Sequence, residues 1–233
     1  MNADFIINEL RSIGTTEKAA ILQRFFKTGK GQYGEGDVFL GVVVPHTRSI
    51  ARANRRTPLE EIAQLLHRPY HEARLCALFI LIEQFNKAPN KERDLFYNFY
   101  LTHMDCINNW DLVDLSAPKI VGEYLIDKDR AILYRLVESA CLWEQRIAII
   151  STLSFIRKND FFDTFELAKR LLTHKHDLMH KAVGWMLREV GKRDRKALTD
   201  FLEEFSTTMP RTTLRYAIEH YPEPERYYFL KKK

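Results

Sequence analysis

The segment Asn108–Leu115 carries the side chains best suited to chemistry. Trp110 and Asp114 are four residues apart and therefore share one face of a helix, with Asp111 beside them. A carboxylate flanked by an indole is suited to stabilising a transient cation. The alternative interpretation is structural, with Asp111 as a favourable charge at a helix N-terminus and Trp110 as a half-buried packing residue.

A second segment, His180–Asp194, is rich in basic side chains. Four cations are interleaved with Trp185, and they are Lys181, Arg188, Lys192 and Arg193. Phosphates attract such charges while sugars or bases pack on aromatic rings, so this composition is typical of contact with a nucleic-acid backbone. A solvated helix face is the alternative, which Glu189 and Asp194 partly support.

Glycines mark two places with unusual backbone. Gly184 stands inside the predicted helix of the basic segment, where glycine costs about 1 kcal/mol relative to alanine. We therefore expect a neighbouring helix or a ligand to approach the backbone closely at Gly184. Five glycines lie within residues 29–45 and predict a shaped loop. This loop neither follows a predicted strand nor has the full spacing of a nucleotide-binding loop, which argues against a phosphate cradle.

The elements that hold these residues are predicted to be helices. Apolar residues recur three and four apart along most of the chain, and strand-like alternation is almost absent. Thr57 is placed to cap a helix that has Pro58 in its first turn and continues through Leu66. Further amphipathic stripes predict helices at about 70–85, 91–103, 109–126, 130–140, 142–156, 161–172, 178–190, 194–205 and 211–220.

The helices are predicted to form repeats of about 36 residues. Arg74, Trp110, Arg146 and Lys181 follow one another at spacings of 36, 36 and 35 residues. This is the period of two-helix solenoid repeats, so we expect an all-α superhelical solenoid of stacked helical hairpins. The four residues then share one face, which in helical solenoids is concave and binds partners, and here it is expected to be basic. The alternative is that the two arginines make local ion pairs.

Composition limits the class of protein. A chain of 233 residues can bury a core without disulfides or metal, and we expect one domain over 1–226 followed by a tail at 227–233, disordered at its end. The net charge of +5 suggests an anionic partner. The sequence has neither an apolar run near the length of a membrane span nor a secretory signal, so we expect a cytoplasmic protein. Cys76, Cys106 and Cys141 are expected to be reduced core residues.

The spacing of histidines, cysteines and carboxylates does not predict a metal site. His174, His176 and His180 lie close together in the sequence, but no cysteine or carboxylate completes a recognisable ligand set, and neighbouring lysines would repel a cation. The sequence also has no defensible Ser-His-Asp or Cys-His nucleophile arrangement. We therefore expect neither metal nor covalent nucleophilic chemistry.

Four separated motifs nevertheless form a specific combination. In chain order they are Tyr33–Val42 with Pro45 and Arg48, Asn109–Asp114, Trp143–Arg146 and Lys181–Glu189. Together they resemble the DNA alkylation repair family, the AlkD-like alkylpurine DNA glycosylases built of HEAT-like repeats. The resemblance covers nearly the whole chain.

The resemblance implies hydrolysis of the N-glycosidic bond of cationic N3- or N7-alkylated purines in duplex DNA. The carboxylate matching Asp114 would stabilise positive charge on deoxyribose and help to place the attacking water. Trp110 and Trp185 would pack on the sugar and backbone of the lesion, and Arg146 would hold a neighbouring phosphate. Other members carry a second aromatic where this chain has Asn109, so we expect a looser lesion contact.

The resemblance further implies that the damaged nucleotide is recognised through its backbone while its base stays stacked, unlike glycosylases that flip the base into a pocket. It implies no cofactor, and we expect a monomer. The DNA contacts are expected from Arg74, Arg146, Lys181, Arg188, Lys192 and Arg193. A DNA-binding relative without excision activity and a protein-interaction solenoid are the alternatives, the second being disfavoured by a basic rather than apolar face.

Overall fold

The protein is almost entirely helical. The computed structural model describes residues 2–232, and about 70% of the chain is in helices. The described residues contain no β-sheet, only an isolated parallel bridge between Val38 and Tyr70. The predicted all-α class is therefore confirmed. None of the described helices is both long and apolar enough to cross a membrane.

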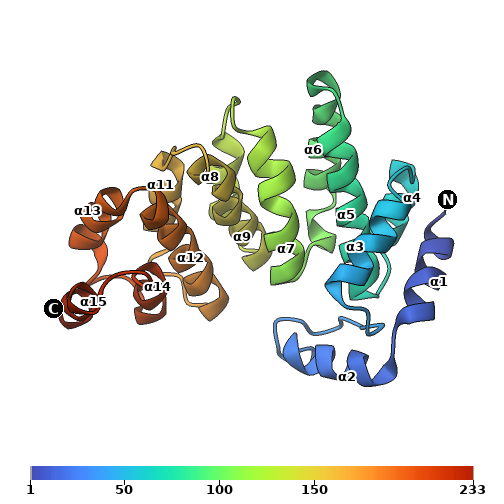
Figure 1. Ribbon diagram of the computed structural model, residues 1–233, viewed down its shortest axis with the longest axis horizontal. Helices are drawn as coiled ribbons and strands as arrows, with labels where there is room; N and C mark the ends of the chain where they lie inside the picture. The colour runs from blue at the N-terminus through green and yellow to red at the C-terminus, as the bar shows by residue number, and fades with distance from the viewer. Residues whose placement is uncertain (1, 233) are drawn as a thin grey trace. The chain divides into compact units, whose positions relative to one another are not determined.

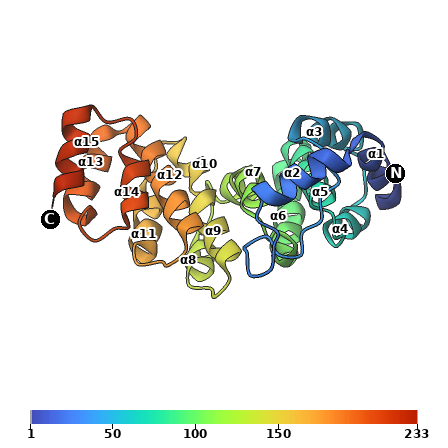
Figure 2. The same ribbon diagram turned by 90° about the horizontal axis from the view of Figure 1, so that it is seen from below.

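The chain divides into two compact units, where the sequence predicted a single domain over 1–226. Unit 1 extends to Ser116 and unit 2 begins at Ala117. The boundary falls within the last turn of α7, and a short π-helical segment follows directly. Figures 1 and 2 show both units as sets of short, neighbouring helices.

Unit 1 is organised around one buried helix. Its elements are α1 (Ala3–Ile13), α2 (Thr16–Phe25), α3 (Val44–Ala53), α4 (Leu59–Leu66), α5 (His71–Lys87), η1 (Asn90–Glu92), α6 (Arg93–Thr102), η2 (Met104–Cys106) and α7 (Trp110–Ala117). Helix α5 contacts α1, α3, α4 and α6, and every residue from His71 to Ile82 is buried. A helix surrounded in this way needs apolar residues on all sides, which the sequence of α5 provides from Leu75 onward.

Unit 2 is organised around α12 in the same way. Its elements are η3 (Pro118–Gly122), α8 (Ala131–Val137), α9 (Leu142–Ser151), α10 (Leu153–Ile156), α11 (Phe162–Leu171), α12 (Asp177–Arg193), α13 (Arg195–Phe205), α14 (Arg211–Ala217) and α15 (Glu223–Lys231). Helix α12 contacts α9, α10, α11, α13 and α14. Helices α8 and α9 lie side by side, as do α11 and α12 (Figures 1 and 2).

The helix predictions agree with the structure from residue 59 onward, where each predicted range contains a helix. Helices α1, α2 and α3 were not predicted, nor was α15. Helix α2 has no buried residue and α15 buries only Phe229 among its residues, so neither has a strong apolar stripe. Within the predicted tail of 227–233, residues 227–231 belong to α15, while Lys233 lies outside the described residues.

Two local predictions were wrong. The hydroxyl of Thr57 does not cap α4 but donates to the carbonyl of Asn54, and Pro58 stands at the N-cap without a side-chain hydrogen bond. Cys141 is exposed, because it precedes the first residue of α9 rather than lying within a packed helix. Cys76 and Cys106 are buried, as predicted.

The repeat register agrees with the helix boundaries. Arg74, Trp110, Arg146 and Lys181 all lie within the first five residues of a helix, in α5, α7, α9 and α12 respectively. Helices α5, α9 and α12 each follow a shorter helix, whereas α7 has 8 residues and follows α6, which has 10. All four positions thus lie near the start of a helix, and the stacking of the hairpins into one solenoid stays a prediction.

Gly184 allows α12 and α14 to approach closely. A Cβ atom at this position would lie 2.7 Å from the carbonyl oxygen of Thr213 and 2.5 Å from the Cβ of Tyr216, both in α14. Real Cβ atoms do not approach other atoms so closely. The expected close approach is thus made by a neighbouring helix.

Replacing Gly184 with alanine should destabilise the protein, although alanine favours the helix by about 1 kcal/mol. The clash with the α14 backbone should outweigh that gain and lower the free energy of unfolding by about 1–3 kcal/mol, the usual cost of overpacking. Gly191→Ala is the control in the same helix, because there the nearest atom is a flexible Leu198 methyl group. Urea denaturation of both variants measures the effect; equal stability would contradict the packing argument.

Candidate functional site

The segment from Asn109 to Asp114, at the start of α7, presents two side chains outward and turns two inward. Trp110 and Asp114 are both partly exposed on the face they share. Asn109 and Asp111 are buried, and each also caps backbone: the side-chain oxygen of Asn109 accepts from Trp110 N at 2.8 Å, and Asp111 Oδ1 accepts from Leu112 N at 2.8 Å. The inward pair fixes the orientation in which the outward pair is presented.

A buried network of charged and polar side chains holds the inward pair. The imidazole of His71 lies between two carboxylates, with Nδ1 3.0 Å from Asp37 Oδ2 and Nε2 2.8 Å from Asp111 Oδ2. Asp37 also accepts from Arg74 Nη2 at 2.5 Å and from Asn109 Nδ2 at 3.0 Å. All five side chains are buried, so unit 1 contains two carboxylates, a guanidinium and an imidazole with almost no access to water.

The charges of this network are balanced when His71 is protonated. Burial by itself lowers the pKa of His71, but the charges and hydrogen bonds of Asp111 and Asp37 raise it to about 9. Burial likewise raises the pKa of Asp37, but the hydrogen bond from His71 and the charge of Arg74 lower it below its ordinary value. With both ring nitrogens as donors, two cations face two carboxylates, which is the condition under which buried charges are tolerated.

The glycine-rich loop delivers Asp37 to this network. The buried carboxylate of Glu72 accepts three consecutive backbone N–H groups of the loop, those of Leu40, Gly41 and Val42, at 2.9, 2.8 and 3.1 Å. Gly41 has φ +87, and a Cβ there would lie 2.2 Å from the Thr15 carbonyl oxygen. The loop therefore serves as a strap between α2 and the start of α5, and the glycine is needed for its close packing.

A column of rings connects the network to Trp110. The ring of Phe39 stacks on His71 with centroids 4.5 Å apart, and Phe26 lies 4.9 Å from His71 on a tilted plane. Phe26 in turn stacks on Trp110 at 5.2 Å, and Phe25 meets the same indole edge-on at 6.0 Å. Since Phe25 is 61% exposed, the column ends in an aromatic surface beside Trp110.

Asp114 lies close to the buried phenol of Tyr100. Burial and the negative charge of Asp114 both raise the pKa of Tyr100, so that its hydroxyl stays protonated and bonds to Ser116 Oγ at 2.9 Å. Ser116 donates back to the carbonyl of Leu112 at 2.5 Å. The second turn of α7 is thus also tied to the core.

Arg74 occupies a different environment from the one that a DNA contact requires. Its side chain is 9% exposed and its guanidinium is paired with Asp37. The local ion pair, which the sequence left open as an alternative, is therefore present, because the glycine-rich loop covers the start of α5. Arg74 acts within the protein to neutralise Asp37.

Unit 2 places Arg146 against the start of α12. Arg146 is buried, and its Nη1 donates to the carbonyl of Leu178 at 2.6 Å. Lys181 lies one turn further along α12 and pairs with Asp177 at 2.7 Å. Arg193 is exposed at the end of the same helix. Of the cations predicted to contact DNA, Lys181 and Arg193 are thus part of α12, and Arg146 of α9 bonds to the start of α12.

The middle of α12 carries Trp185 among ion-paired cations. The indole N–H of Trp185 donates to Glu189 Oε1 at 3.2 Å, and Lys192 pairs with the same carboxylate at 2.7 Å. Arg188 pairs with Glu219 of the segment after α14. The expected basic residues are present at the surface of unit 2, but Glu189 pairs with them and partly neutralises their positive charge. This agrees with the alternative interpretation, a solvated helix face.

Comparison with known protein families identifies the chain. The family described as "DNA alkylation repair enzyme" matches residues 6–221. The chain belongs to this DNA alkylation repair family. A solved structure described as a predicted DNA alkylation repair enzyme from Enterococcus faecalis has a similar fold, with a TM-score of 0.70, 16% sequence identity, and coverage of 90% of this chain and 97% of that one. No curated protein matches this chain.

Several residues that build the site in this DNA alkylation repair family member were not singled out from the sequence. They are Asp37, His71, Glu72, Phe26 and Phe39. His71 and Glu72 lie in the same short segment as Arg74, at the start of α5, and Asp37 lies in the glycine-rich motif. A charged pair at the start of an otherwise apolar helix was the available signal, since buried charges require partners.

The state of His71 should make the stability of the protein depend on pH. Because its folded-state pKa is raised from 6.5 to about 9, its contribution is complete below pH 6.5 and is lost as the pH rises through about 9. The free energy of unfolding should fall across this window with a slope of up to about 1.4 kcal/mol per pH unit. Urea denaturation at several pH values in this range measures the slope.

His71→Gln is the matching variant, since it keeps a hydrogen-bonding side chain but cannot be charged. It should be less stable than the parent at pH 6.5 and show a much flatter dependence up to pH 9. The buried thiols of Cys76 and Cys106 affect stability mainly above this window, because folding raises their pKa from 9.0, which lies at its upper end. An equal slope in parent and variant would mean that His71 is neutral in the folded protein.

Proposed function

We propose that the protein is a DNA glycosylase that hydrolyses the N-glycosidic bond of cationic N3- or N7-alkylated purines in duplex DNA. Membership of the DNA alkylation repair family supports a role in repair of alkylated DNA. The observation that carries the finer proposal is the outward face of α7, where a partly exposed carboxylate, Asp114, lies one helical turn from a partly exposed indole, Trp110.

The chemistry requires little beyond a well-placed negative charge. In a cationic alkylpurine, the bond between C1′ and the purine nitrogen breaks with its electron pair moving into the base, which leaves as a neutral molecule. The positive charge then resides on the deoxyribose as an oxocarbenium ion. Water adds to C1′ and loses a proton, giving an abasic site. The leaving group needs no protonation, so no general acid is required.

The proposed role of Asp114 is to stabilise the oxocarbenium ion and to accept a hydrogen bond from the attacking water. A preorganised charge is effective because the protein does not have to reorganise during the reaction. The ties of Asn109, Asp111 and Ser116 to the core provide this rigidity. Trp110, supported from behind by Phe26, offers a flat surface for the deoxyribose.

The proposed role of unit 2 is to bind the DNA backbone through Trp185 and the exposed cations of α12, whereas Arg146 is as buried as Arg74 and bonds to the Leu178 carbonyl. Lys181 and Lys192 pair with carboxylates while 41% and 43% of their side chains remain exposed. Such pairs contribute about 0–1 kcal/mol, so either lysine can exchange its carboxylate for a phosphate at little cost. Arg193 adds a further exposed cation.

A DNA-binding protein without excision activity is the second candidate, favoured by the exposed lysines of α12 on either side of Trp185. The two candidates differ at Asp114, which a non-catalytic protein does not need. Release of methylated purine from alkylated duplex DNA, with unmodified duplex as the control substrate, tests the glycosylase directly. Binding without release would leave the non-catalytic function.

Asp114→Asn should lower the rate of base release by roughly 10²–10³, because it removes the charge but keeps the shape of the side chain. DNA affinity should change little. Single-turnover base release with enzyme in excess isolates the chemical step, and equilibrium binding to the same duplex provides the second readout. Asp127→Asn, which removes an exposed carboxylate after η3, is the control and should behave like the parent. Loss of binding together with chemistry would make Asp114 a structural residue.

Lys181→Gln and Lys192→Gln should each flatten the plot of log affinity against log salt by roughly 0.9, as expected when one phosphate contact is lost. Lys87→Gln is the control, because Lys87 is an exposed lysine of α5 whose i,i+4 neighbour Glu83 gives it a similar pairing. Titrations of an unmodified duplex at several salt concentrations measure the slopes. If all three variants keep the parental slope, the lysines of α12 do not contact DNA.

A further inference from the structure

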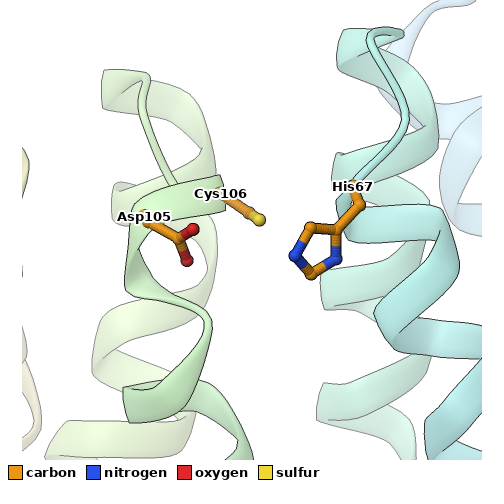
Figure 3. Close-up of side chains that lie close together, drawn as sticks. All are labelled: His67, Asp105 and Cys106. Atoms are coloured by element: carbon orange, nitrogen blue, oxygen red, sulfur yellow. The ribbon is translucent and has the colours of Figure 1, made fainter.

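Three potential metal ligands lie together in unit 1, and none of them belongs to the buried network around His71. They are His67, Asp105 and Cys106, and one ligand atom of each lies within 4.8 Å of the others. His67 directly follows α4, whereas Asp105 and Cys106 belong to η2. Figure 3 shows the imidazole of His67 facing the Asp105 carboxylate and the Cys106 sulfur across the space between these segments.

The imidazole of His67 is held in the form that can bind a metal. Its Nδ1 lies 2.8 Å from the carbonyl oxygen of Ala63. A carbonyl can only accept, so Nδ1 carries the hydrogen and Nε2 of the neutral ring has a free electron pair. Figure 3 shows Nε2 as the ring nitrogen directed toward Cys106. Metal-binding histidines almost always donate their other N–H to such an outer partner.

His103 provides a nearby second imidazole with the same arrangement. Its Nδ1 lies 2.8 Å from the carbonyl oxygen of Phe99, and its ring centroid is 5.7 Å from that of His67. Both histidines thus bond to the carbonyl four residues earlier in the chain. Either His103 or a water molecule could complete a four-coordinate site.

The ligand types select zinc. A thiolate, an imidazole and a carboxylate are the three ligand classes that zinc accepts, at about 2.0–2.3 Å. A thiolate and a carboxylate together neutralise the double positive charge. Bonds of this length bring ligand atoms to roughly 3.5 Å from one another in a tetrahedron, so the cluster must contract slightly. His67 and Asp105 are exposed and can make this movement, while Cys106 is buried and provides the fixed point.

We propose that His67, Asp105 and Cys106 form a zinc-binding site. It departs from the expectation, drawn from the sequence, that the chain has no metal site. The ion connects the segment after α4 to η2, which ends four residues before Trp110. Zinc therefore stabilises the path of the chain into α7, and binding does not depend on the proposed base excision.

Cobalt(II) is the probe, since it replaces zinc in such sites and reports its ligands by absorbance. Metal-free protein titrated with Co²⁺ should develop a thiolate-to-cobalt charge-transfer band with a stoichiometry of one ion per chain, and Zn²⁺ should abolish it. Zn²⁺ should also raise the Tm, because an ion that binds the folded state stabilises it by mass action. Absence of the charge-transfer band in the parent protein overturns the proposal.

The variants identify the ligands. Cys106→Ser should abolish the charge-transfer band, while Cys141→Ser, which removes an exposed thiol of unit 2, should keep it. His67→Gln and Asp105→Asn alter exposed side chains and should fold normally, and each should weaken cobalt binding at least as much as the roughly 10- to 100-fold cost of losing an outer partner. His46→Gln is the exposed histidine control. Parental affinity in both His67→Gln and Asp105→Asn would overturn the site even if Cys106→Ser fails to fold.

Discussion

The pairing of His71 with Asp37 and Asp111 is the interaction on which the rest of unit 1 depends. A protonated imidazole between two carboxylates joins the glycine-rich loop, the start of α5 and the start of α7 at one buried point. Removing any one charge would leave an uncompensated ion in the core. The free-energy cost of that ion is larger than the net stabilisation that a buried ion pair provides. The network therefore specifies one arrangement of these segments more than it adds to stability, and that arrangement is the one that turns Trp110 and Asp114 outward.

The protein separates the roles of its carboxylates by environment. Asp111 and Asp37 are buried and paired and hold the backbone, whereas Asp114, three residues after Asp111 in the same helix, is partly exposed. The cations are divided similarly: Arg74 is buried against Asp37, while the lysines of α12 form exposed pairs that are readily exchanged. The buried arginine of unit 1 thus has a structural role, while the exposed lysines of α12 remain available for a ligand.

The sequence was sufficient for the helices between residues 59 and 220 and for the face shared by Trp110 and Asp114, since both follow from spacing within one helix. It was insufficient for the network, because Asp37 lies in a loop without periodicity and meets Asn109 across 72 residues. The burial of Arg74 could not be inferred for the same reason: it depends on the loop that covers α5. The cluster of His67 and Cys106 likewise joins separate segments. Close sequence spacing instead drew attention to His174 and His176, which bond within their own segment and, for His174, to Gln145 of α9.

The strap formed by the glycine-rich loop has a consequence for the order in which unit 1 folds. Helices α4 and α5 are adjacent in the chain and can pair through local contacts, but the bonds of Asp37 to His71 and Asn109 close loops of 34 and 72 residues. Closing long loops costs chain entropy before any contact compensates it, so such contacts form late. The helical hairpins of unit 1 therefore assemble first, and the first turn of α7 acquires its final orientation only when the strap docks.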